Sequence, residues 1–384
     1  MNMPILTKNL SVLPFIFIAF LLLAPDASSS ITRTRTMGDA GVILRDDANY
    51  WLFPATIVAG ANRVIFELGG NRELVAYSPE NYGFDRWAGG IVLLKQKAIG
   101  AFWSEATEAQ LFPPFSATAV SADKKLDFFF GSKTSFGALG LHVSRASGLQ
   151  KTTRTPGSEG KTSVTQTRFA LGLSDSSVDT RLSYQLSRYA PSGPEIAGHE
   201  IGFSARLFRT IAERLTWVPF GQLDIDFENR DEIADDTKGK VWDFSIGSGF
   251  NYRIDERNLA VFGISIARTS QSLKTAASES EMSQIDMPFF FGGFESGLLS
   301  WLHVRFGFQK ALRRIESTSE SGEVTNVNTQ AQAPYAMTAG IGVNYKRFIV
   351  DFSWDADFLK RGPYFLSGAD GETFNLVSIA YQFD

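Results

Sequence analysis

WDFSIGSGFNY, residues 242–252, contains the pattern that decides the fold class of this chain. Apolar and aromatic side chains alternate along it with polar side chains and glycines. Successive side chains of a β-strand point to opposite faces, so a strand of this sequence has one apolar face and one largely polar face. The apolar face carries Trp242, Phe244, Ile246, Phe250 and Tyr252, and the other face carries Asp243, Ser245, Gly247, Gly249 and Asn251.

The same alternation recurs along much of the chain. A soluble β-sandwich also alternates, so the pattern alone leaves two architectures open. The predicted strands are often about 10 to 14 residues long, whereas soluble sheets usually have strands of about 5–6 residues and tilted membrane strands have about 9–11. Strand length therefore favours a transmembrane antiparallel β-barrel. The clearest further segments are residues 178–186, 302–309, 337–345, 348–355 and 377–383.

The connections between these segments alternate between short and long, which is typical of outer-membrane barrels with short turns on one side and long loops on the other. Between residues 63 and 383 we count about sixteen segments, and because such barrels usually have even strand numbers we expect fourteen or sixteen. Short connections are expected near residues 131–134, 174–177, 210–213, 255–258 and 346–347. Long polar loops are expected at residues 147–161, 229–238, 272–281 and 316–332.

Residues 1–29 are predicted to be a cleaved export signal. Lys8 is followed by an apolar run over residues 12–23 and then by small residues such as Ala27. That run is shorter than the about 20 residues that a membrane-spanning helix needs, although an uncleaved N-terminal anchor remains the alternative reading. No stretch after Ser30 approaches spanning length, so any crossing of a membrane must use strands.

The composition excludes several classes of function. The net charge is only −4, so there is no polybasic surface for nucleic acid, and we expect no nucleic-acid partner. Cysteine is absent, which removes every thiol-based site. No metal-ligand spacing, phosphate loop or nucleotide motif is present, and we therefore expect neither a cofactor nor a metal.

An enzyme would need a nucleophile and a base. His142, Val143 and Ser144 are similar to the His-x-Ser pair of outer-membrane phospholipases, but that family continues with Asn-Gly, where this chain has Arg145 and Ala146. His142 and Ser144 would share one face of a strand, yet no orienting residue can be assigned to them. We expect no enzymatic activity.

Residues 37–57, MGDAGVILRDDANYWLFPATI, resemble the N-terminal segment of the long-chain fatty-acid transporter family of outer-membrane proteins, which includes the related shuttle proteins of one secretion system. The family has Asn at the position that Phe53 occupies here, so any polar contact of that Asn is lost. The match covers about twenty residues, and the rest of the chain agrees only in barrel character. The matching residues are Gly38, Ala40, Gly41, Asp46, Asp47, Ala48, Asn49, Pro54 and Ala55.

The resemblance implies a small N-terminal hatch, residues 30–61, folded into the lumen of a barrel formed by residues 62–384. It further implies that Asp46, Asp47 and Asn49 anchor the hatch to polar groups of the lumen. Pro54 and Ala55 would then set the exit turn toward the first strand. An ordinary turn or helix cap is the alternative for these residues, because Asp and Asn readily bond their own backbone.

The polar faces of the predicted strands should line the lumen. They carry charges of both signs, so we do not expect a strongly ion-selective ring. Ion pairs that merely pack the interior and a conduction path are both open for these residues. Arg181, Asp243, His303 and Arg305 are our main lumenal candidates; Asp179, Asp224, Asp226, Asn251, Gln309 and Asp351 share the same faces.

One predicted connection contains unusual apolar bulk. Leu111, Phe112 and Phe115 flank two prolines in this segment. Exposed apolar patches often mark binding sites, so the hypothesis is an outer capture site for a hydrophobic ligand. A loop that packs into the mouth of the barrel is the alternative.

Together these features predict an outer-membrane barrel that passes small hydrophobic molecules inward. The alternatives are a non-conducting shuttle barrel that binds partner proteins and a general porin. The expected partners are outer-membrane lipid, a hydrophobic small-molecule substrate and, during biogenesis, the barrel-assembly machinery. That machinery would read the terminal aromatic strand that ends at Phe383, before Asp384.

Overall fold

The computed structural model describes residues 30–60, 62–69, 87–93, 97–104, 124–155, 158–190, 196–231, 236–275, 278–321, 324–354 and 374–383. Short helices occupy the beginning of this described part and strands occupy nearly all the rest. None of the described helices has the length and apolar character needed to cross a membrane. The helices are α2 (Ile31–Thr36) and the 3-10 helices η1 (Ala40–Val42), η2 (Asp47–Tyr50) and η3 (Pro54–Val58). The strands are β1 (Arg63–Gly69), β2 (Trp87–Leu93), β3 (Lys97–Ser104), β4 (Lys124–Thr134), β5 (Gly137–Thr155), β6 (Ser158–Ser174), β7 (Val178–Ala190), β8 (Ile196–Leu207), β9 (Arg209–Ala212), β10 (Leu215–Asp231), β11 (Asp236–Arg253), β12 (Asn258–Lys274), β13 (Ser278–Leu299), β14 (Leu302–Ser321), β15 (Val324–Gln332), β16 (Tyr335–Tyr345), β17 (Phe348–Trp354) and β18 (Phe374–Gln382).

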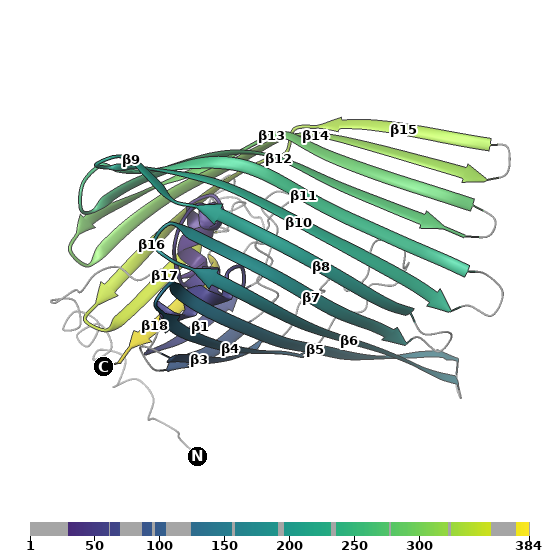
Figure 1. Cartoon of the computed structure of the whole chain (residues 1–384), viewed down its shortest axis with the longest axis horizontal. Helices are drawn as coiled ribbons and strands as arrows, with labels where there is room; N and C mark the ends of the chain where they lie inside the picture. Colours follow the sequence, from purple (N-terminus) through teal and green to yellow (C-terminus); the bar gives the residue numbers. More distant parts are fainter. Residues whose placement is uncertain are drawn as a thin grey trace, which may run out of the picture.

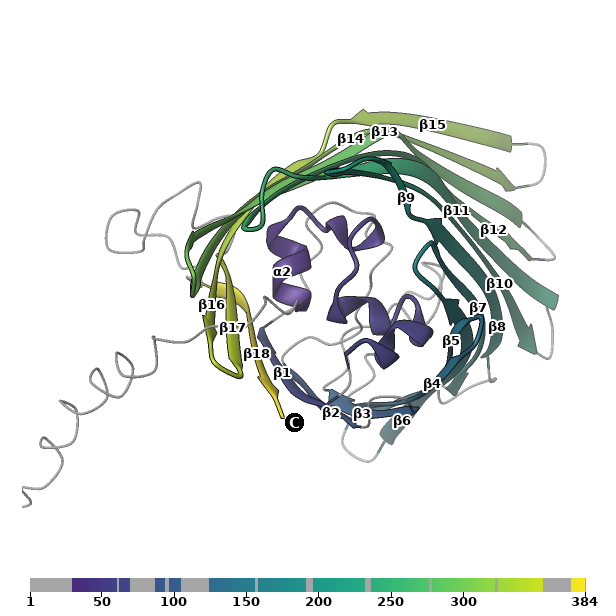
Figure 2. The same ribbon diagram turned by 60° about the vertical axis from the view of Figure 1, so that its left-hand side comes forward.

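The strands form one closed antiparallel sheet, seen from the side in Figure 1 and obliquely along the lumen in Figure 2. The first strand, β1, pairs with both β2 and β18, which closes the ring. Two positions in the ring are each filled by two segments, because β8 and β9 both pair with β10, and β15 and β16 both pair with β14. The 18 described segments therefore occupy 18 − 2 = 16 positions around the barrel, one of the two predicted numbers.

The outer face of the barrel is apolar. Along β12, Phe262, Ile264 and Ile266 are exposed, while the alternate residues Val261 and Ala267 are buried toward the interior. Outward-facing Leu, Ile and Phe residues continue this surface on the other strands. A soluble protein would bury such a belt, whereas lipid covers it in a membrane barrel. The structure confirms the predicted all-β transmembrane barrel.

The two ends of the barrel differ, but not in the way predicted. Short turns join strands at one end, for example between β6 and β7, as expected. The four polar stretches predicted as long loops are largely strand, so that prediction is wrong: β5 continues to Thr155 and β6 begins at Ser158, for example. Backbone hydrogen bonding continues after the sheet leaves the lipid, so polar Ser- and Thr-rich sequence marks contact with water rather than the end of a strand. Figure 1 shows these hairpins projecting from one end of the barrel.

The hatch lies inside the barrel. Figure 2 shows α2 and the three 3-10 helices within the ring of strands. Its residues are almost entirely buried; Met37, Ile43 and Ile57, for example, are each 0% exposed. The lumen at this level is therefore filled by the first described residues of the chain.

Replacing Ile264 with arginine tests whether lipid covers the outer face. This side chain lies on the outer surface of β12, and an arginine facing lipid near the middle of the bilayer costs about 2–4 kcal/mol. We expect Ile264→Arg to lower the free energy of unfolding by that amount in urea titrations of the barrel in lipid vesicles. Ile264→Leu is the control, and equal stability of the two variants would contradict lipid contact at this face.

Candidate functional site

The hatch starts with a capped helix and a sharp change of direction. The Ser30 hydroxyl accepts a hydrogen bond from the backbone N–H of Arg33 at 3.0 Å, which caps α2. After the helix, Gly38 and Asp39 have φ angles of 73° and 52°, in the left-handed region. Two such residues in succession end the helix and turn the chain across the lumen. Pro54 then occupies the first turn of η3, where its fixed φ suits helix initiation.

Arg206 of β8 is the most extensive link between the barrel and the hatch. Its side chain is fully buried, and its Nε donates to Asp179 of β7 at 2.9 Å. A second nitrogen, Nη2, donates to the side-chain oxygen of Asn49 at 2.7 Å. Short helices leave carbonyl groups without internal partners, and this guanidinium supplies donors to them. Its Nη1 donates to the carbonyl oxygens of Gly41, Val42 and Leu44 at 2.7, 3.1 and 2.6 Å.

The motif residues take different positions around this link. Asn49 is held by Arg206 and donates to the Gly41 carbonyl at 3.0 Å, so it joins the wall to the interior of the hatch. Asp46 instead accepts from Thr34 at 2.6 Å, within the hatch itself. The backbone of Asp47 begins η2. Asn49 therefore binds a lumenal polar group directly, as expected of an anchor, while the side chain of Asp47 lies outside the described part of the structure.

Phe53, the departure from the family motif, also contacts Arg206. The guanidinium carbon lies 4.4 Å from the centre of the Phe53 ring, which is buried. A cation above an aromatic face is stabilised by the ring quadrupole, more so where water is excluded. The aromatic ring thus adds a cation–π contact to the link between Arg206 and the hatch.

A second polar cluster ties α2 to the opposite wall. Arg33 donates to Glu295 of β13 at 2.8 and 3.0 Å, and Arg305 of β14 donates to the same carboxylate at 2.5 Å. Arg305 also donates to Asp351 of β17 at 2.5 Å, which in turn accepts from the Ser30 hydroxyl at 2.5 Å. Burial alone lowers the pKa of Arg33, but Glu295, Asp46 and Asp351 together more than offset this, and the pKa lies above its usual value. The cluster has two positive and two negative groups and is neutral.

Further wall side chains bond to the backbone of the hatch. The β14 residue Gln309 donates to the Gly38 carbonyl at 3.1 Å and to the Asp39 carboxylate at 3.1 Å. The backbone of the hatch is thereby held from several sides of the barrel. Two further bonds of this kind run from Asn251 to the Ile43 carbonyl at 2.7 Å and from Thr338 to the Thr36 carbonyl at 3.1 Å.

Glycines of the wall allow the hatch backbone to approach closely. A Cβ atom on Gly140 of β5 would lie 2.3 Å from the backbone nitrogen of Ala55, and one on Gly307 of β14 would lie 2.2 Å from that of Gly38. Real side chains do not fit in such gaps. These gaps let the 3-10 helix that begins with Pro54 and Ala55 pack directly on the wall. The motif had led us to expect an exit turn at these two residues.

Apolar packing surrounds the polar links. Met37 and Ile43 belong to one buried cluster with Phe220 and Phe291 of the wall. On the other side, Ile57 and Trp51 pack with wall residues, and the Trp51 ring centre lies 4.9 Å from that of Phe102 and 5.7 Å from that of Phe129. Burial of these side chains stabilises the closed arrangement.

The other lumenal candidates lie on the inner wall as predicted from the alternation. Arg181 is buried, with its guanidinium 3.5 Å from the Asp224 carboxylate, which is ion pairing across the sheet. His303 is also buried, while Asp243 is half-buried. Neither is among the hatch contacts described above, whereas Arg305 supports the hatch through Glu295 and Asp351.

The His142 pair has an acidic partner that sequence reasoning did not assign. The Nε2 atom of His142 lies 2.7 Å from the Asp127 carboxylate of β4, and the imidazole stacks on Phe129 with ring centres 4.2 Å apart. Ser144 lies on the same buried face of β5. These contacts position the imidazole in the packing beneath the hatch.

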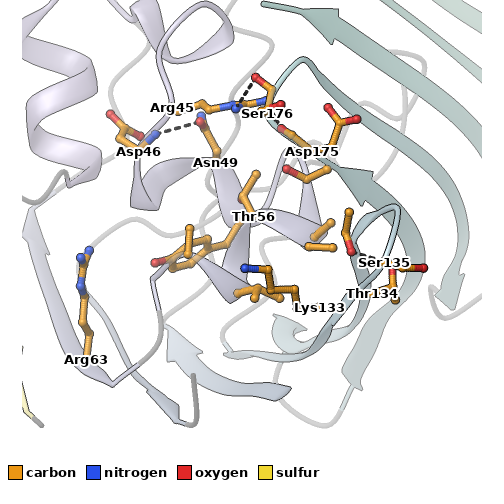
Figure 3. Close-up of a pocket in the computed structure, with 17 residues that line it drawn as sticks. Arg45, Asp46, Asn49, Thr56, Arg63, Lys133, Thr134, Ser135, Asp175 and Ser176 are labelled. Carbon is orange, nitrogen blue, oxygen red and sulfur yellow. Dashed lines mark hydrogen bonds between the residues drawn. The ribbon is translucent and has the colours of Figure 1, made fainter. Parts of the chain in front are cut away.

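A pocket of about 720 Å³ lies between the hatch and the short turns (Figure 3). Its hatch side includes Arg45, Asn49 and Thr56, and its turn side includes Lys133 and Asp175. Arg45 crosses this boundary, because its guanidinium donates to the carbonyls of Asp175 and Ser176 at 2.6 and 3.0 Å. The pocket thus reaches the hatch from the end of the barrel that carries the short turns.

One predicted site cannot be compared with the structure, and two of the contact residues were not predicted. The capture hypothesis for Leu111, Phe112 and Phe115 lies outside the described residues. Arg206 and Glu295 were not singled out by sequence reasoning, although the same alternation that places Arg305 inward also places Arg206 inward. Alternation could have identified the side that they face, but not their partners.

Replacing Arg206 should loosen the hatch. Arg206→Ala removes donors from three hatch carbonyls and an ion-pair partner from buried Asp179, and losing one partner of a buried pair usually costs about 3–5 kcal/mol. We expect limited proteolysis in detergent to cleave residues 31–57 much faster, with the barrel still intact. Arg209→Ala, which removes an exposed arginine on β9, should leave cleavage unchanged; equal rates in both variants would disprove the link.

Adding one methyl group at Gly140 should displace η3. The new Cβ of Gly140→Ala would meet the backbone of Ala55 at 2.3 Å, and overpacking of this kind costs about 1–3 kcal/mol. Hydrogen exchange of the η3 amides should then accelerate. Gly221→Ala is the matched control, because its Cβ would meet nothing closer than the Ser245 carbonyl at 3.6 Å. Unchanged η3 exchange in the Gly140 variant would refute the tight contact.

Comparisons with known proteins find likeness in structure only. No family model matches the chain, and no curated protein matches it in sequence. Among solved structures, the toluene transporter TodX of Pseudomonas putida is 11% identical, with 93% of this chain and 99% of that chain covered and a TM-score of 0.35. The ferric-catecholate import receptor Fiu of E. coli is 8% identical over 84% of this chain and 81% of that one, with a TM-score of 0.34. CdiB from Escherichia coli is 10% identical over 84% and 62%, with a TM-score of 0.40. Each TM-score is below 0.5, so these likenesses carry no argument about function.

Proposed function

We propose that this chain is an outer-membrane transporter that passes small hydrophobic molecules without an energy source of its own. The observation that carries the proposal is a lipid-facing barrel whose lumen is filled by a hatch attached through non-covalent contacts. A barrel of sixteen positions without such a filling has room for an aqueous channel. A molecule can therefore pass through the lumen only when the hatch is displaced.

The contacts of the hatch support a gate more than a permanent plug. They consist of side-chain hydrogen bonds, a neutral ion cluster and packing against glycines, all of which can re-form after displacement. The pocket beneath the hatch extends from Asn49 and Thr56 to the turns near Lys133. Movement of η2 and η3 would join the lumen to this pocket. We place the pocket at the periplasmic exit, because short turns of such barrels face the periplasm.

The hydrophobic class of the cargo is supported by two features of the chain. The motif at residues 37–57 resembles that of the fatty-acid transporter family. In addition, the hatch presents Trp51 and Ile57 to Phe102 and Phe129 of the wall, so separation of these surfaces exposes apolar side chains to a passing molecule. We propose no catalytic step for this chain.

One observation favours a polar cargo as the second candidate. On the wall beyond the hatch, away from the short turns, Glu200 faces Asp226 across β8 and β10, and Asp224 faces Asp243 across β10 and β11. Arg168 is 3.1 Å from Glu200, and together with Arg181 it balances only part of this negative charge. An inner wall of this kind suits a hydrophilic or cationic solute.

Deleting residues 31–57, with the export signal retained, tests the gate. In planar bilayers the intact protein should show little conductance, whereas the deletion variant should show steady channels of porin-like size, since the lumen is then open to water. Heat-modifiable migration in gels would confirm that the variant is a folded barrel. Equal conductance of the two folded proteins would rule out a plug.

Uptake measurements separate the two cargo classes. Cells that lack the protein are compared with complemented cells for uptake of a labelled long-chain fatty acid, toluene and a hydrophilic sugar. Loss of uptake of the first two alone supports the proposal, loss of sugar uptake alone supports the polar alternative, and no loss of any kind favours a barrel that binds partner proteins. Arg209→Ala serves as a complementation control because Arg209 lies at the surface.

A further inference from the structure

The wall of the barrel is irregular where β13, β14, β15 and β16 meet. Asp286 of β13 pairs with Arg313 of β14, and Phe289 pairs with Ala311. Between these pairs, two residues of β13, Met287 and Pro288, lie opposite the single residue Leu312 of β14. At the same level β14 changes its partner from β16, which begins at Tyr335, to β15, which ends at Gln332. These two irregularities leave a groove of about 600 Å³, lined by Ile285, Met287, Leu312, Arg314 and Ala331 among others.

The groove opens outward and is closed toward the lumen. Met287 and Leu312 are 59% and 48% exposed, on the face that contacts lipid. Behind them, Arg313 donates to both carboxylate oxygens of Asp286 at 2.7 Å each, and both side chains are buried. This bidentate pair completes the inner wall. The groove is therefore a pocket on the outer surface rather than a passage through the barrel.

Two arginines flank the upper part of the groove. Ile285 pairs with Arg268 of β12 on one side and with Arg314 of β14 on the other. Directly opposite residues have Cβ atoms about 5 Å apart, so the Cβ atoms of the two arginines are about 10 Å apart, one on each side of Ile285. Arg268 also lies over the Trp242 ring at 5.0 Å, which limits its conformations. Arg314 is paired with Glu316, but both side chains are exposed, and such pairs are weak.

The arginines lie where a lipid headgroup is expected. Arg268 is ten residues from the first residue of β12 (268 − 258), and Arg314 is twelve from the first residue of β14 (314 − 302). A strand tilted by about 40° rises roughly 2.5 Å per residue along the membrane normal, which places both arginines about 25–30 Å from the short turns. The apolar band of such barrels is about 25 Å tall. Both cations therefore lie at the far boundary of the apolar band.

An apolar surface continues from the groove toward the membrane centre. Phe262, Phe290 and Phe308 form a cluster on the outer wall, with ring centres 6.3 and 6.5 Å from that of Phe262. Lys310, at the edge of this cluster, lies 5.7 Å from the centre of the Tyr335 ring. Arg268 and Arg314 at the boundary, the groove below them and the tilted aromatic rings further in match a headgroup and an acyl chain in order of depth. Lys310 lies between Leu312 and Phe308 on the outer face of β14, with its ammonium group near the Tyr335 ring.

We infer that this groove binds a membrane lipid with a phosphate-bearing headgroup, whose phosphate contacts Arg268 and Arg314 while an acyl chain lies against Met287 and Leu312. A wholly apolar cargo would offer neither arginine an anionic contact. A free phosphate ion would leave the groove unfilled. The inference is independent of the proposed transport function, since the groove is separated from the lumen by the Asp286–Arg313 pair.

Lipid titration with native mass spectrometry tests the charge requirement. The detergent-solubilised protein should bind dioleoylphosphatidylglycerol well above dioleoylphosphatidylcholine, which has the same acyl chains but no net charge. Arg268→Gln with Arg314→Gln should weaken phosphatidylglycerol binding about thirtyfold, as expected when two basic residues near a lipid surface are lost. The matched control, Arg209→Gln with Arg253→Gln, removes two exposed cations at the short-turn end. This control should change phosphatidylglycerol binding little.

Three outcomes of that titration would overturn the inference. They are equal binding of the two lipids to the intact protein, equal losses in both double variants, and displacement of the lipid by inorganic phosphate at similar concentrations. Heat-modifiable migration in gels controls for folding of each variant. Transport assays on the same variants show whether any loss of binding is accompanied by a loss of uptake, which the inference does not require.

Photo-crosslinking locates the occupant directly. A benzophenone amino acid at Leu312, inside the groove, should yield adducts with phosphate-bearing lipid in cells. The same group at Met337, exposed on the outer face of β16, is the control and should yield fewer such adducts. Adducts at position 312 that consist mainly of protein or of a supplied hydrocarbon would assign the groove to a partner chain or to cargo and refute lipid binding.

Discussion

Buried backbone carbonyls need hydrogen-bond donors, and this constraint governs how the lumen is closed. The hatch is built from helices of three to six residues, too short to satisfy their own ends. Barrel side chains provide the missing donors, with Arg206 serving three carbonyls and Gln309 and Asn251 one each. Without these side chains the segment would expose unpaired polar groups in a space that excludes most water, and the packed arrangement would not form.

Charge balance also contributes to the attachment of α2. Arg33 and Arg305 face Glu295 and Asp351, so these four groups balance one another, and buried Asp46 of the hatch lies 3.8 Å from Arg33. If α2 moved away, Arg33 and Glu295 would lose each other and Asp351 would lose the Ser30 hydroxyl, which couples the movement of the helix to rehydration of the wall.

The sequence was sufficient for the barrel and insufficient for the contacts of the hatch, for a physical reason. Alternation determines which way a side chain faces, so the inward positions of Arg181, Asp243, His303 and Arg305 were predictable, and so was an even strand number. Alternation does not determine which residues meet across the lumen, and for this reason the role of Arg206 was missed. The polar hairpins were mistaken for loops because water contact and loss of strand structure have the same signature in composition.

The contacts between the hatch and the last strands determine when the lumen can close during synthesis. Thr32 bonds to Ser378, 346 positions further along the chain, and Ser30 bonds to Asp351, 321 positions away. The segment that leaves the ribosome early therefore has no place to dock until the final strands have been made and inserted. Until then its bonds to Asp351 and Ser378 cannot form. The last strands complete the ring and also supply the docking site of the hatch. Closure of the barrel and burial of the hatch therefore occur together, late in assembly.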